Sequence, residues 1–273
     1  MKTLKTFQKI LTICVAFGFT ASTYAVPDFK SEIIKYKIQL KGFTVGSVLM
    51  RTLKVQKNRF QIIARVSSFK AIKKVYFVQG SFGAIWNYKT KKSYLAWEDI
   101  YQGTSYQRRS YRFDAKRVFV SKHEKTFSEA GFPHNGPLKK NKKKDYYINE
   151  TKYQDLLGVF YQLRSQPKPP KKGDVFKLPV LPAGTKKIMY IQILGRKTVN
   201  VPALGGKRRV FHVRTGLLNE NQKMAGGDIF IVTQSPIDMY ITDDMEYIPV
   251  LMWTTVPIVG KVYINLSEYI KKD

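Results

Sequence analysis

The feature that most constrains the fold of this chain is a strict alternation of apolar and polar residues. In the segment 34–40, IKYKIQL, every second residue is apolar and the residues between them are Lys, Lys and Gln. A period of two places one face of a strand in a core and the other face in water. Further runs rich in β-branched and aromatic residues occur at 45–53, 60–66, 74–88, 93–101, 105–120, 187–194, 209–215, 228–232, 247–254 and 262–266.

These runs are separated by Gly, Pro, Asn and Asp, and helical patterns are nearly absent between them. The chain is therefore predicted to be mainly β, as a curved antiparallel sheet or an open, barrel-like meander with one amphipathic helix packed on it. Gly205-Gly206 is predicted to centre a hairpin turn, and residues 114–116 are predicted to form the turn within the run at 105–120. Gly80 and Gly83 are predicted to interrupt the run at 74–88.

One helix is predicted over residues 152–165. Thr151 and Gln154 have the spacing of a capping box, in which each side chain satisfies a free N–H of the first turn. The prolines of the segment 166–170, QPKPP, end the helix. The apolar stripe of this helix, expected to lie on the concave face of the sheet, consists of Tyr153, Leu156, Leu157, Phe160 and Leu163.

The first 25 residues have the pattern of a cleavable Sec-type signal peptide. Three lysines precede an apolar run of 11 residues at 10–20, and small residues occupy positions 23 and 25. The run is shorter than the roughly 20 residues that a membrane-spanning helix needs. We therefore expect a periplasmic protein whose mature chain, 26–273, has no transmembrane segment. Because Cys14 is the only cysteine and lies in the leader, disulfide and thiolate chemistry are excluded from the mature chain.

The mature chain is expected to be a single β-rich domain, with strands over 32–121, a basic loop over 130–147, the helix, and strands over 174–268. The basic loop contains five lysines and is predicted to be flexible because its charges repel one another. These lysines are Lys139, Lys140, Lys142, Lys143 and Lys144.

The chain carries a formal net charge of +29, and removal of the leader, with three lysines and no acidic residue, leaves +26. In the cytoplasm this excess would indicate nucleic acid, but in the cell envelope the available polyanions are different. The expected partners are an anionic lipid, a glycolipid such as lipopolysaccharide, or a wall polymer, and the charge also suits association with a membrane surface. An acidic protein partner and a merely solvated cationic surface are the open alternatives.

Catalytic patterns are missing from the sequence. None of His123, His134 and His212 has the spacing of a metal-ligand motif, and no catalytic residue, metal or cofactor is predicted. Asp243-Asp244 is interpreted as a turn in which an Asp side chain accepts a backbone N–H. The segment 106–113, YQRRSYRF, either forms a stacking platform for bases or sugars or, as we favour, has a wet basic face and a dry aromatic face.

The order of motifs along the mature chain resembles the bacterial exported family called "domain of unknown function 3108". The matching segments are YKIQLKGFTVG at 36–46, YRFD at 111–114, DLLGVFYQLR at 155–164, GD at 173–174, ITDDMEYIPV at 241–250, VG at 259–260 and Leu266. The resemblance implies a β-rich exported domain with no established reaction, and it transfers no catalytic residues. This chain departs from the family pattern at Gly158, where a small hydroxyl residue is expected, and in its very basic segment 133–144.

The interpretation that fits these observations best is a non-enzymatic envelope protein that binds an anionic amphiphile or polymer in or beside a groove between sheet and helix. Fold-level similarity to periplasmic lipid and lipoprotein carriers supports it only as analogy. The predicted binding residues are the five lysines of the basic loop together with Leu156, Phe160, Leu163 and Arg164, the last also a candidate to pair a carboxylate beneath the helix.

Two alternatives remain. One is an assembly protein that docks an acidic partner through its lysine block. The weaker one is a wall hydrolase using Asp243, Asp244 or Glu246. The distinguishing question is whether the space beneath Leu156, Phe160 and Leu163 is filled or open.

Overall fold

A single antiparallel sheet dominates the computed structural model, which describes residues 31–69, 78–129, 136–166, 169–221, 236–244, 246–256 and 260–272. The sheet has 14 strands. They are β1 (Glu32–Leu40), β2 (Phe43–Gln56), β3 (Arg59–Ser68), β4 (Val78–Asn87), β5 (Lys92–Gln102), β6 (Ser105–Phe113), β7 (Val118–Phe127), β8 (Leu138–Ile148), β9 (Val175–Val180), β10 (Lys187–Val201), β11 (Gly206–Leu218), β12 (Ile237–Thr242), β13 (Pro249–Val256) and β14 (Gly260–Lys271).

The strands follow one another in the sheet almost as they do in the chain. Their order is β8-β7-β6-β5-β4-β3-β2-β1-β14-β13-β12-β11-β10-β9, so the pairing of β1 with β14 joins two meanders. The sheet does not close into a barrel, and its two edges are β8 and β9. The predicted fold, a mainly β chain with a curved antiparallel sheet and one amphipathic helix, is confirmed.

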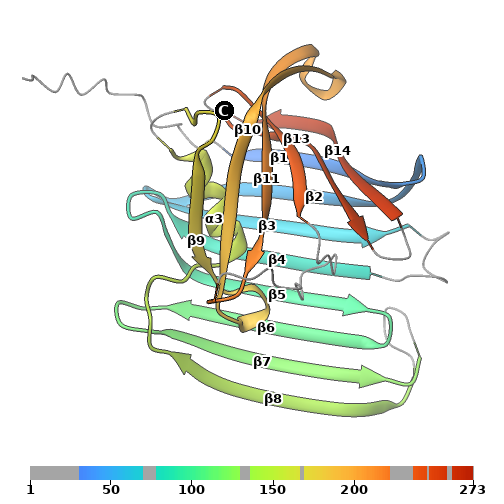
Figure 1. The fold of residues 1–273 in the computed structure, drawn as a ribbon. Coiled ribbons are helices and arrows are strands. Elements are labelled where there is room, and N and C mark those ends of the chain that lie inside the picture. The colour runs from blue at the N-terminus through green and yellow to red at the C-terminus, as the bar shows by residue number, and fades with distance from the viewer. Residues whose placement is uncertain are drawn as a thin grey trace, which may run out of the picture.

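The connection between the two edge strands contains the helix α3 (Leu156–Arg164). In Figure 1, β9 and β10 stand upright in the view beside and in front of α3, whereas β2–β8 run across it and β5–β8 lie below the helix. α3 contacts β4 and β5 on one side and β9 on the other. The sheet therefore curves around the helix, and two short 3₁₀ turns, η1 (Pro182–Gly184) and η2 (Pro202–Leu204), connect the strands of the second meander.

Strand β1 shows why the alternating pattern produces this sheet. Ile34 and Tyr36 are buried at 0% and 2% exposure, whereas Lys35 and Lys37 between them are exposed. Burying an aliphatic or aromatic side chain stabilises the fold by roughly 1.5–3 kcal/mol. Ile34 and Tyr36 pack in one core cluster with Val210, Ile248 and Val250 of the second meander. Burial of one face of β1 thus holds the two meanders together.

The lysine block is a strand, not the loop predicted over 130–147. Leu138–Ile148 forms β8 and pairs antiparallel with β7, from Phe127↔Leu138 to Val118↔Ile148. Only its last residues are anchored, because Ile148 is buried and the Tyr146 hydroxyl donates a hydrogen bond to the Gly184 carbonyl (2.7 Å). A strand with both faces in water over most of its length needs no apolar alternation, which is why the sequence pattern did not reveal it.

The turns were predicted more accurately than the glycine breaks. Asp114 Oδ1 accepts hydrogen bonds from the N–H groups of Lys116 and Arg117, and the β10–β11 hairpin closes at Gly205, whose φ of 78° is left-handed. Both predicted turns are confirmed. The predicted interruption at Gly80 and Gly83 is wrong, because β4 runs through both residues. The predicted strand at 228–232 lies outside the described residues.

Gly83 is required in β4 because a large side chain lies over it. Gly83 pairs with Trp97 of β5, and a Cβ atom placed on Gly83 would overlap the indole ring. The Trp97 ring occupies the space that a side chain at position 83 would fill. The glycine here therefore accommodates the ring and does not interrupt the strand. In the part of the chain that the structure describes, no helix is long and apolar enough to span a membrane.

We expect Gly83→Ala to lower the free energy of unfolding by about 1–3 kcal/mol, the usual cost of forcing an extra group into a packed site. Urea unfolding, followed by the backbone circular dichroism signal instead of tryptophan fluorescence, measures the loss of stability. Adding Trp97→Leu to the same chain should recover part of it, since the overlapping ring is then gone. Equal stability of Gly83→Ala and the wild type would contradict this account.

Candidate functional site

The start of α3 is set by Asp155 and not by the predicted capping box. Asp155 is the N-cap, and its Oδ1 accepts a hydrogen bond from the Gly158 N–H at 2.9 Å. Its other oxygen accepts a hydrogen bond from the Ser93 hydroxyl of β5. Gln154 cannot serve the cap because its backbone pairs with β9, through bonds to the Pro179 carbonyl and the Leu181 N–H. The prediction of Thr151 and Gln154 as a capping box is therefore wrong.

This cap also explains why residue 158 is glycine. A Cβ at Gly158 would overlap the Ser93 hydroxyl and lie 2.7 Å from Asp155 Oδ2. Burial raises the pKa of the Asp155 carboxyl, while the hydrogen bonds from Ser93 and Gly158 lower it. The hydroxyl expected on the helix at this position is supplied here by Ser93 of the facing strand.

The other end of α3 is held by a buried ion pair. The Arg164 guanidinium, 3% exposed, donates to both carboxylate oxygens of Glu32, 5% exposed, with Nη2 at 2.9 Å from Oε2. Arg164 Nε donates to the Glu246 carbonyl at 2.7 Å. The hydroxyls of Tyr161 and Tyr269 donate to the same carboxylate, at 2.7 and 3.3 Å. Arg164 therefore pairs a carboxylate beneath the helix, and Glu32 neutralises its charge.

The pKa of Glu32 shows that its carboxylate form is favoured. Burial raises the pKa, but the Arg164 charge and the hydrogen bonds from Arg164, Tyr161 and Tyr269 outweigh that effect and hold the pKa below its usual value. The same pairing raises the pKa of Arg164 despite its burial. Both partners thus remain ionised in the folded protein.

An open cavity of about 580 Å³ lies between α3 and strands β9–β12. The predicted residues Leu156, Phe160, Leu163 and Arg164 all line it, so the space beneath the helix stripe is open. Sequence reasoning did not identify the opposite wall, although its alternation was visible in the run at 187–194. That wall consists of Phe176, Met189, Ile191, Ile193, Phe211, Val213, Thr215, Ile237, Met239, Ile241 and Tyr247.

The helix presents two apolar sides, and this corrects the predicted packing. Val159 and Tyr161, outside the predicted stripe, are its most deeply buried large apolar residues at 1% exposure each. Val159 packs with Val180 and Leu217, and Tyr161 with Phe60 and Trp86. Leu156, Phe160 and Leu163 are only partly buried and face the cavity. Three residues of the predicted stripe therefore line an open space, whereas the other two, Tyr153 and Leu157, belong to or pack against the core.

The polar lining of this cavity comes mainly from one segment. Apart from Thr215 and Tyr247, its polar side chains are Arg164, Gln166, Lys171 and Asp174. Asp174 Oδ2 accepts a hydrogen bond from the Lys171 N–H at 2.7 Å, and Lys171 itself is exposed. The cavity thus combines apolar walls with a polar border formed where the chain leaves α3 and enters β9.

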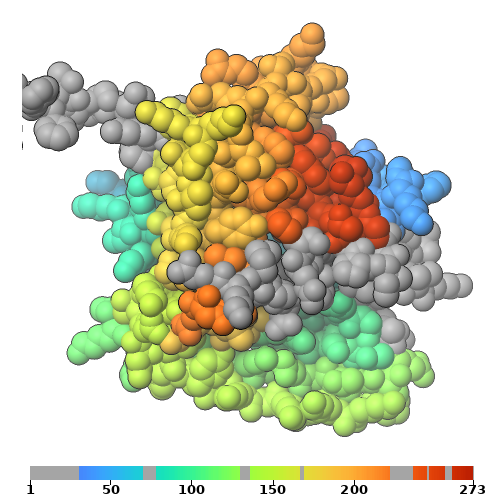
Figure 2. Space-filling model, in the orientation of Figure 1, coloured from blue at the N-terminus to red at the C-terminus, as the bar shows by residue number. Residues whose placement is uncertain are grey.

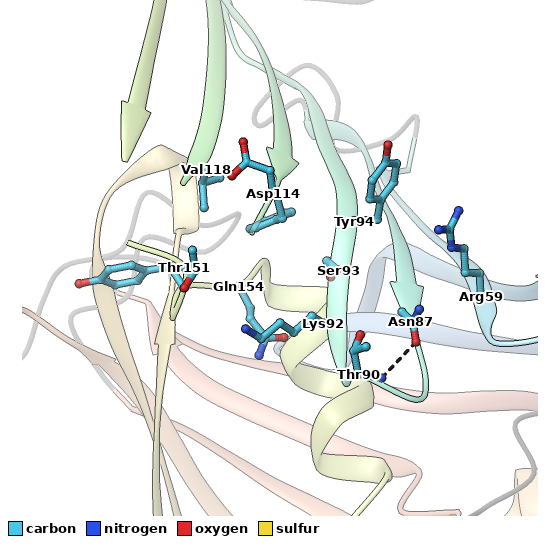
Figure 3. Close-up of a pocket in the computed structure, with 12 residues that line it drawn as sticks. Arg59, Asn87, Thr90, Lys92, Ser93, Tyr94, Asp114, Val118, Thr151 and Gln154 are labelled. Atoms are coloured by element: carbon cyan, nitrogen blue, oxygen red, sulfur yellow. Dashed lines mark hydrogen bonds between the residues drawn. The ribbon is translucent and has the colours of Figure 1, made fainter. Parts of the chain in front are cut away.

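A second pocket, of about 210 Å³, lies near the N-terminal end of α3. Its lining is more polar and includes Arg59, Lys92, Asp114 and Gln154. Figure 3 shows Arg59 and Tyr94 on one side of β5 and Thr151 and Gln154 on the other, with the Thr90 N–H donating to Asn87 Oδ1. Because these groups do not converge on one point, this pocket is the weaker candidate for a binding site.

The five predicted lysines lie elsewhere. All are exposed on β8, and none of them lines the 580 Å³ cavity. The structure thus divides the predicted binding residues into a cavity group and an edge group. The strand 106–113 has the expected wet face, with Arg108 and Arg112 exposed, but Arg109 is buried at 2% on the dry face, where it pairs with Glu98 at 2.9 Å.

The acidic residues proposed for a hydrolase are engaged in structural contacts. Asp244 Oδ1 accepts hydrogen bonds from the N–H groups of Glu246 and Tyr247, as the turn interpretation predicts. Asp243 forms ion pairs with Arg209 at 2.6 Å and Arg196 at 3.0 Å. Glu246 binds Tyr269 and Lys271. Over the described ranges, no group of three or more His, Cys, Asp or Glu residues could hold a metal ion.

Comparison with known proteins gives one family and a shared fold. The family model described as "Protein of unknown function (DUF3108)" matches residues 35–267. No curated protein matches the sequence. A β-barrel-like protein of domain of unknown function DUF1849 from Brucella abortus superposes with a TM-score of 0.61 at 9% identity, covering 91% of this chain and 100% of that one. At that identity the likeness shows the fold alone.

A Bacteroides fragilis protein with a YmcC-like fold is more distant. It has a TM-score of 0.32 at 9% identity, over 90% of this chain and 98% of that one. A score this low establishes no common architecture.

Arg164→Met should lower the free energy of unfolding by about 3–5 kcal/mol, because it leaves the Glu32 carboxylate buried without its partner. Adding Glu32→Leu should recover part of the loss. The matched control is Lys35→Met, which removes the exposed ion pair between Lys35 and Glu268 (2.7 Å) and should cost less than about 1 kcal/mol. Urea unfolding measures all three variants, and equal losses for Arg164→Met and Lys35→Met would refute the anchoring role.

The Glu32 pair also predicts a pH dependence. Because the folded pKa of Glu32 lies below the ordinary value of 4.5, its contribution to stability is complete above that value and is lost as the pH falls through the folded pKa. The stability difference between wild type and Glu32→Gln, measured by urea unfolding at a series of pH values, should therefore be constant near neutrality and shrink in acid. A stability difference that grows as the pH falls would mean that folding raises the pKa of Glu32, and would contradict this prediction.

Proposed function

We propose that this chain, which belongs to the DUF3108 family of proteins of unknown function, is a non-enzymatic periplasmic protein that binds an anionic amphiphile in the cavity beneath α3. The observation that carries the proposal is the open space of about 580 Å³ under Leu156, Phe160 and Leu163. A cavity of this size lies within the range of ligand pockets, roughly 300–1,000 Å³. The signal-peptide pattern of residues 1–25 supports the proposed location.

The walls of the cavity favour an apolar chain over a polar ligand. Its sides are Leu, Ile, Val, Met and Phe from α3, β9, β10, β11 and β12. Each buried CH₂ contributes about 0.8 kcal/mol, so an acyl chain of about ten carbons supplies about 8 kcal/mol before the cost of association. A sugar or a nucleotide would have to leave its polar groups unpaired against these walls. The apolar chain therefore supplies the affinity.

The polar border supports an anionic headgroup. Lys171 is an exposed cation at the border, whereas Arg164 is already neutralised by Glu32. The mature chain carries a formal net charge of +26, which attracts anions over the whole surface. The headgroup would thus remain in solvent beside Gln166, Lys171 and Asp174, and the Lys171 ammonium would contact it.

The chemistry of the cavity lining favours binding without catalysis. The titratable residues among its described lining are Arg164, Lys171, Asp174 and Tyr247. Arg164 is paired, and Asp174 accepts a backbone N–H. A nucleophile beside a general base, the arrangement that covalent catalysis requires, is not found among these four. This composition supports the proposal that the cavity holds a ligand without cleaving it.

The test is to produce the full chain with its own leader in an exporting host, purify it gently, and identify bound lipid by mass spectrometry. We expect a co-purifying amphiphile in the wild type. Met239→Trp, which fills the cavity from β12, should reduce lipid content and the affinity for a fluorescent fatty acid at least tenfold. The matched control is Leu53→Trp on the outer surface, where the native side chain is 44% exposed, and it should retain wild-type binding.

Two results would contradict the proposal. One is a wild-type protein that contains no lipid and does not bind the fluorescent fatty acid. The other is an equal loss of binding in Met239→Trp and Leu53→Trp, because only the first changes the cavity. Circular dichroism of both variants checks that each is folded.

A further inference from the structure

We propose that the free edge strand β8 is a docking surface for an anionic lipid bilayer. The site lies outside the cavity and does not depend on what the cavity binds. It goes beyond the proposed function, since it concerns where the protein sits and not what it carries.

The geometry of β8 exposes its lysines along one line. The strand has 11 residues and, among the described strands, pairs only with β7 and ends the sheet. Its first eight residues, 138–145, are all exposed, and five of them are lysines. At about 3.4 Å per residue the strand is about 37 Å long. In Figure 2, β7 and β8 form the lower rim of the molecule, so a flat surface can reach the whole row.

These lysines are not neutralised by the rest of the described protein. Across the β7–β8 pairing, Lys142 faces Glu124 and Lys144 faces Lys122. The Glu124 carboxylate is already paired with Lys122 at 2.8 Å. In the described residues, none of the five lysines forms an ion pair with a carboxylate. The positive charge of the edge is thus available to an external anion.

The surroundings of the edge strengthen the charge. Residues 105–148 contain twelve basic and four acidic residues. Arg108, Arg112 and Arg117 of this stretch are exposed on β6 and at the start of β7. Positive charges of neighbouring side chains add to one another in attracting an anionic surface, within a screening distance of roughly 8 Å at physiological salt. The edge therefore forms a continuous cationic region, and not an isolated lysine run.

Apolar and aromatic groups on the same strand favour a lipid surface over a protein strand. Leu138 and Tyr147 are 49% and 47% exposed, and the Arg117 guanidinium lies 4.0 Å from the centre of the Tyr147 ring. Tyrosine, with an apolar body and a polar tip, suits the boundary between headgroups and acyl chains. Lysines on an edge strand oppose the addition of another strand, and a second copy would place lysine opposite lysine.

The experiment compares two variants that lose the same charge. The edge variant carries Lys140→Gln, Lys142→Gln and Lys144→Gln. The control carries Lys197→Gln, Lys207→Gln and Arg208→Gln on the exposed β10–β11 hairpin. Each full-chain protein, purified from an exporting host, is sedimented with phosphatidylcholine vesicles that contain or lack phosphatidylglycerol, at low and at high salt.

We expect the wild type to bind only the anionic vesicles, and to release them at high salt. Because one lysine near an anionic surface changes partitioning about fivefold, the edge variant should bind about 100-fold more weakly while the control binds nearly as well as the wild type. An equal decrease in both variants would overturn the proposal, since net charge alone would then explain binding. Tight binding of a polyglutamate peptide without binding to vesicles would also overturn it, in favour of an acidic protein partner. Circular dichroism confirms that each variant is folded.

Discussion

The buried ion pair between Glu32 and Arg164 is the interaction on which the rest of this structure depends. It joins the first residue of β1 to the last residue of α3, and through Tyr269 and the Glu246 carbonyl it reaches β14 and the turn before β13. Charges this deeply buried are tolerated only when they are paired and hydrogen-bonded.

Because the ion pair fixes the helix at one end while Asp155 and Ser93 fix it at the other, α3 is held above the sheet without having to fill the space beneath it. The cavity is open because the helix is positioned by polar contacts at its two ends and by the packing of Val159 and Tyr161 on its far side.

The open order of the sheet separates two kinds of surface. The cavity lies among β9–β12, where four strands turn apolar faces toward the helix, and its ligand chemistry is apolar. The cationic edge is β8, at the opposite end of the strand order, and its chemistry is electrostatic. A closed barrel would have no edge strand to carry such a row of lysines. The same incomplete closure leaves room for the connection from β8 to β9, which contains the helix.

The sequence predicted the parts of this structure that have a local signal. The alternation in β1, the Asp114 turn, the Gly205 hairpin and the Asp244 turn all follow from a few neighbouring residues, and each is found in the structure. The predictions for Gly83, for the helix cap and for the basic loop were wrong because each outcome depends on another strand. Trp97 of β5 covers Gly83, and the backbone of Gln154 pairs with β9. The lysine block pairs with β7 although it has almost no apolar face. Leu156, Phe160 and Leu163 line the groove as predicted, but its opposite wall comes from strands that begin only at Val175 and further along the chain. Arg109 shows the same limit, since its burial depends on an ion pair with Glu98 of the neighbouring strand.

The pairing of β1 with β14 has a consequence for how the sheet forms during folding. The strand that starts the first meander finds its second neighbour only in the last twelve-residue strand, and the Lys272 N–H donates to the Ser31 carbonyl beside them. Hairpins such as β2–β3 or β10–β11 can assemble from neighbouring residues, but this seam spans nearly the whole polypeptide, and long-range pairings of this kind form slowly. Until β14 pairs with them, β1 and β13 each keep an unpaired edge in the middle of the sheet. An unpaired strand edge of this kind can add a strand from another chain, so β14 also shields the sheet from association at its centre.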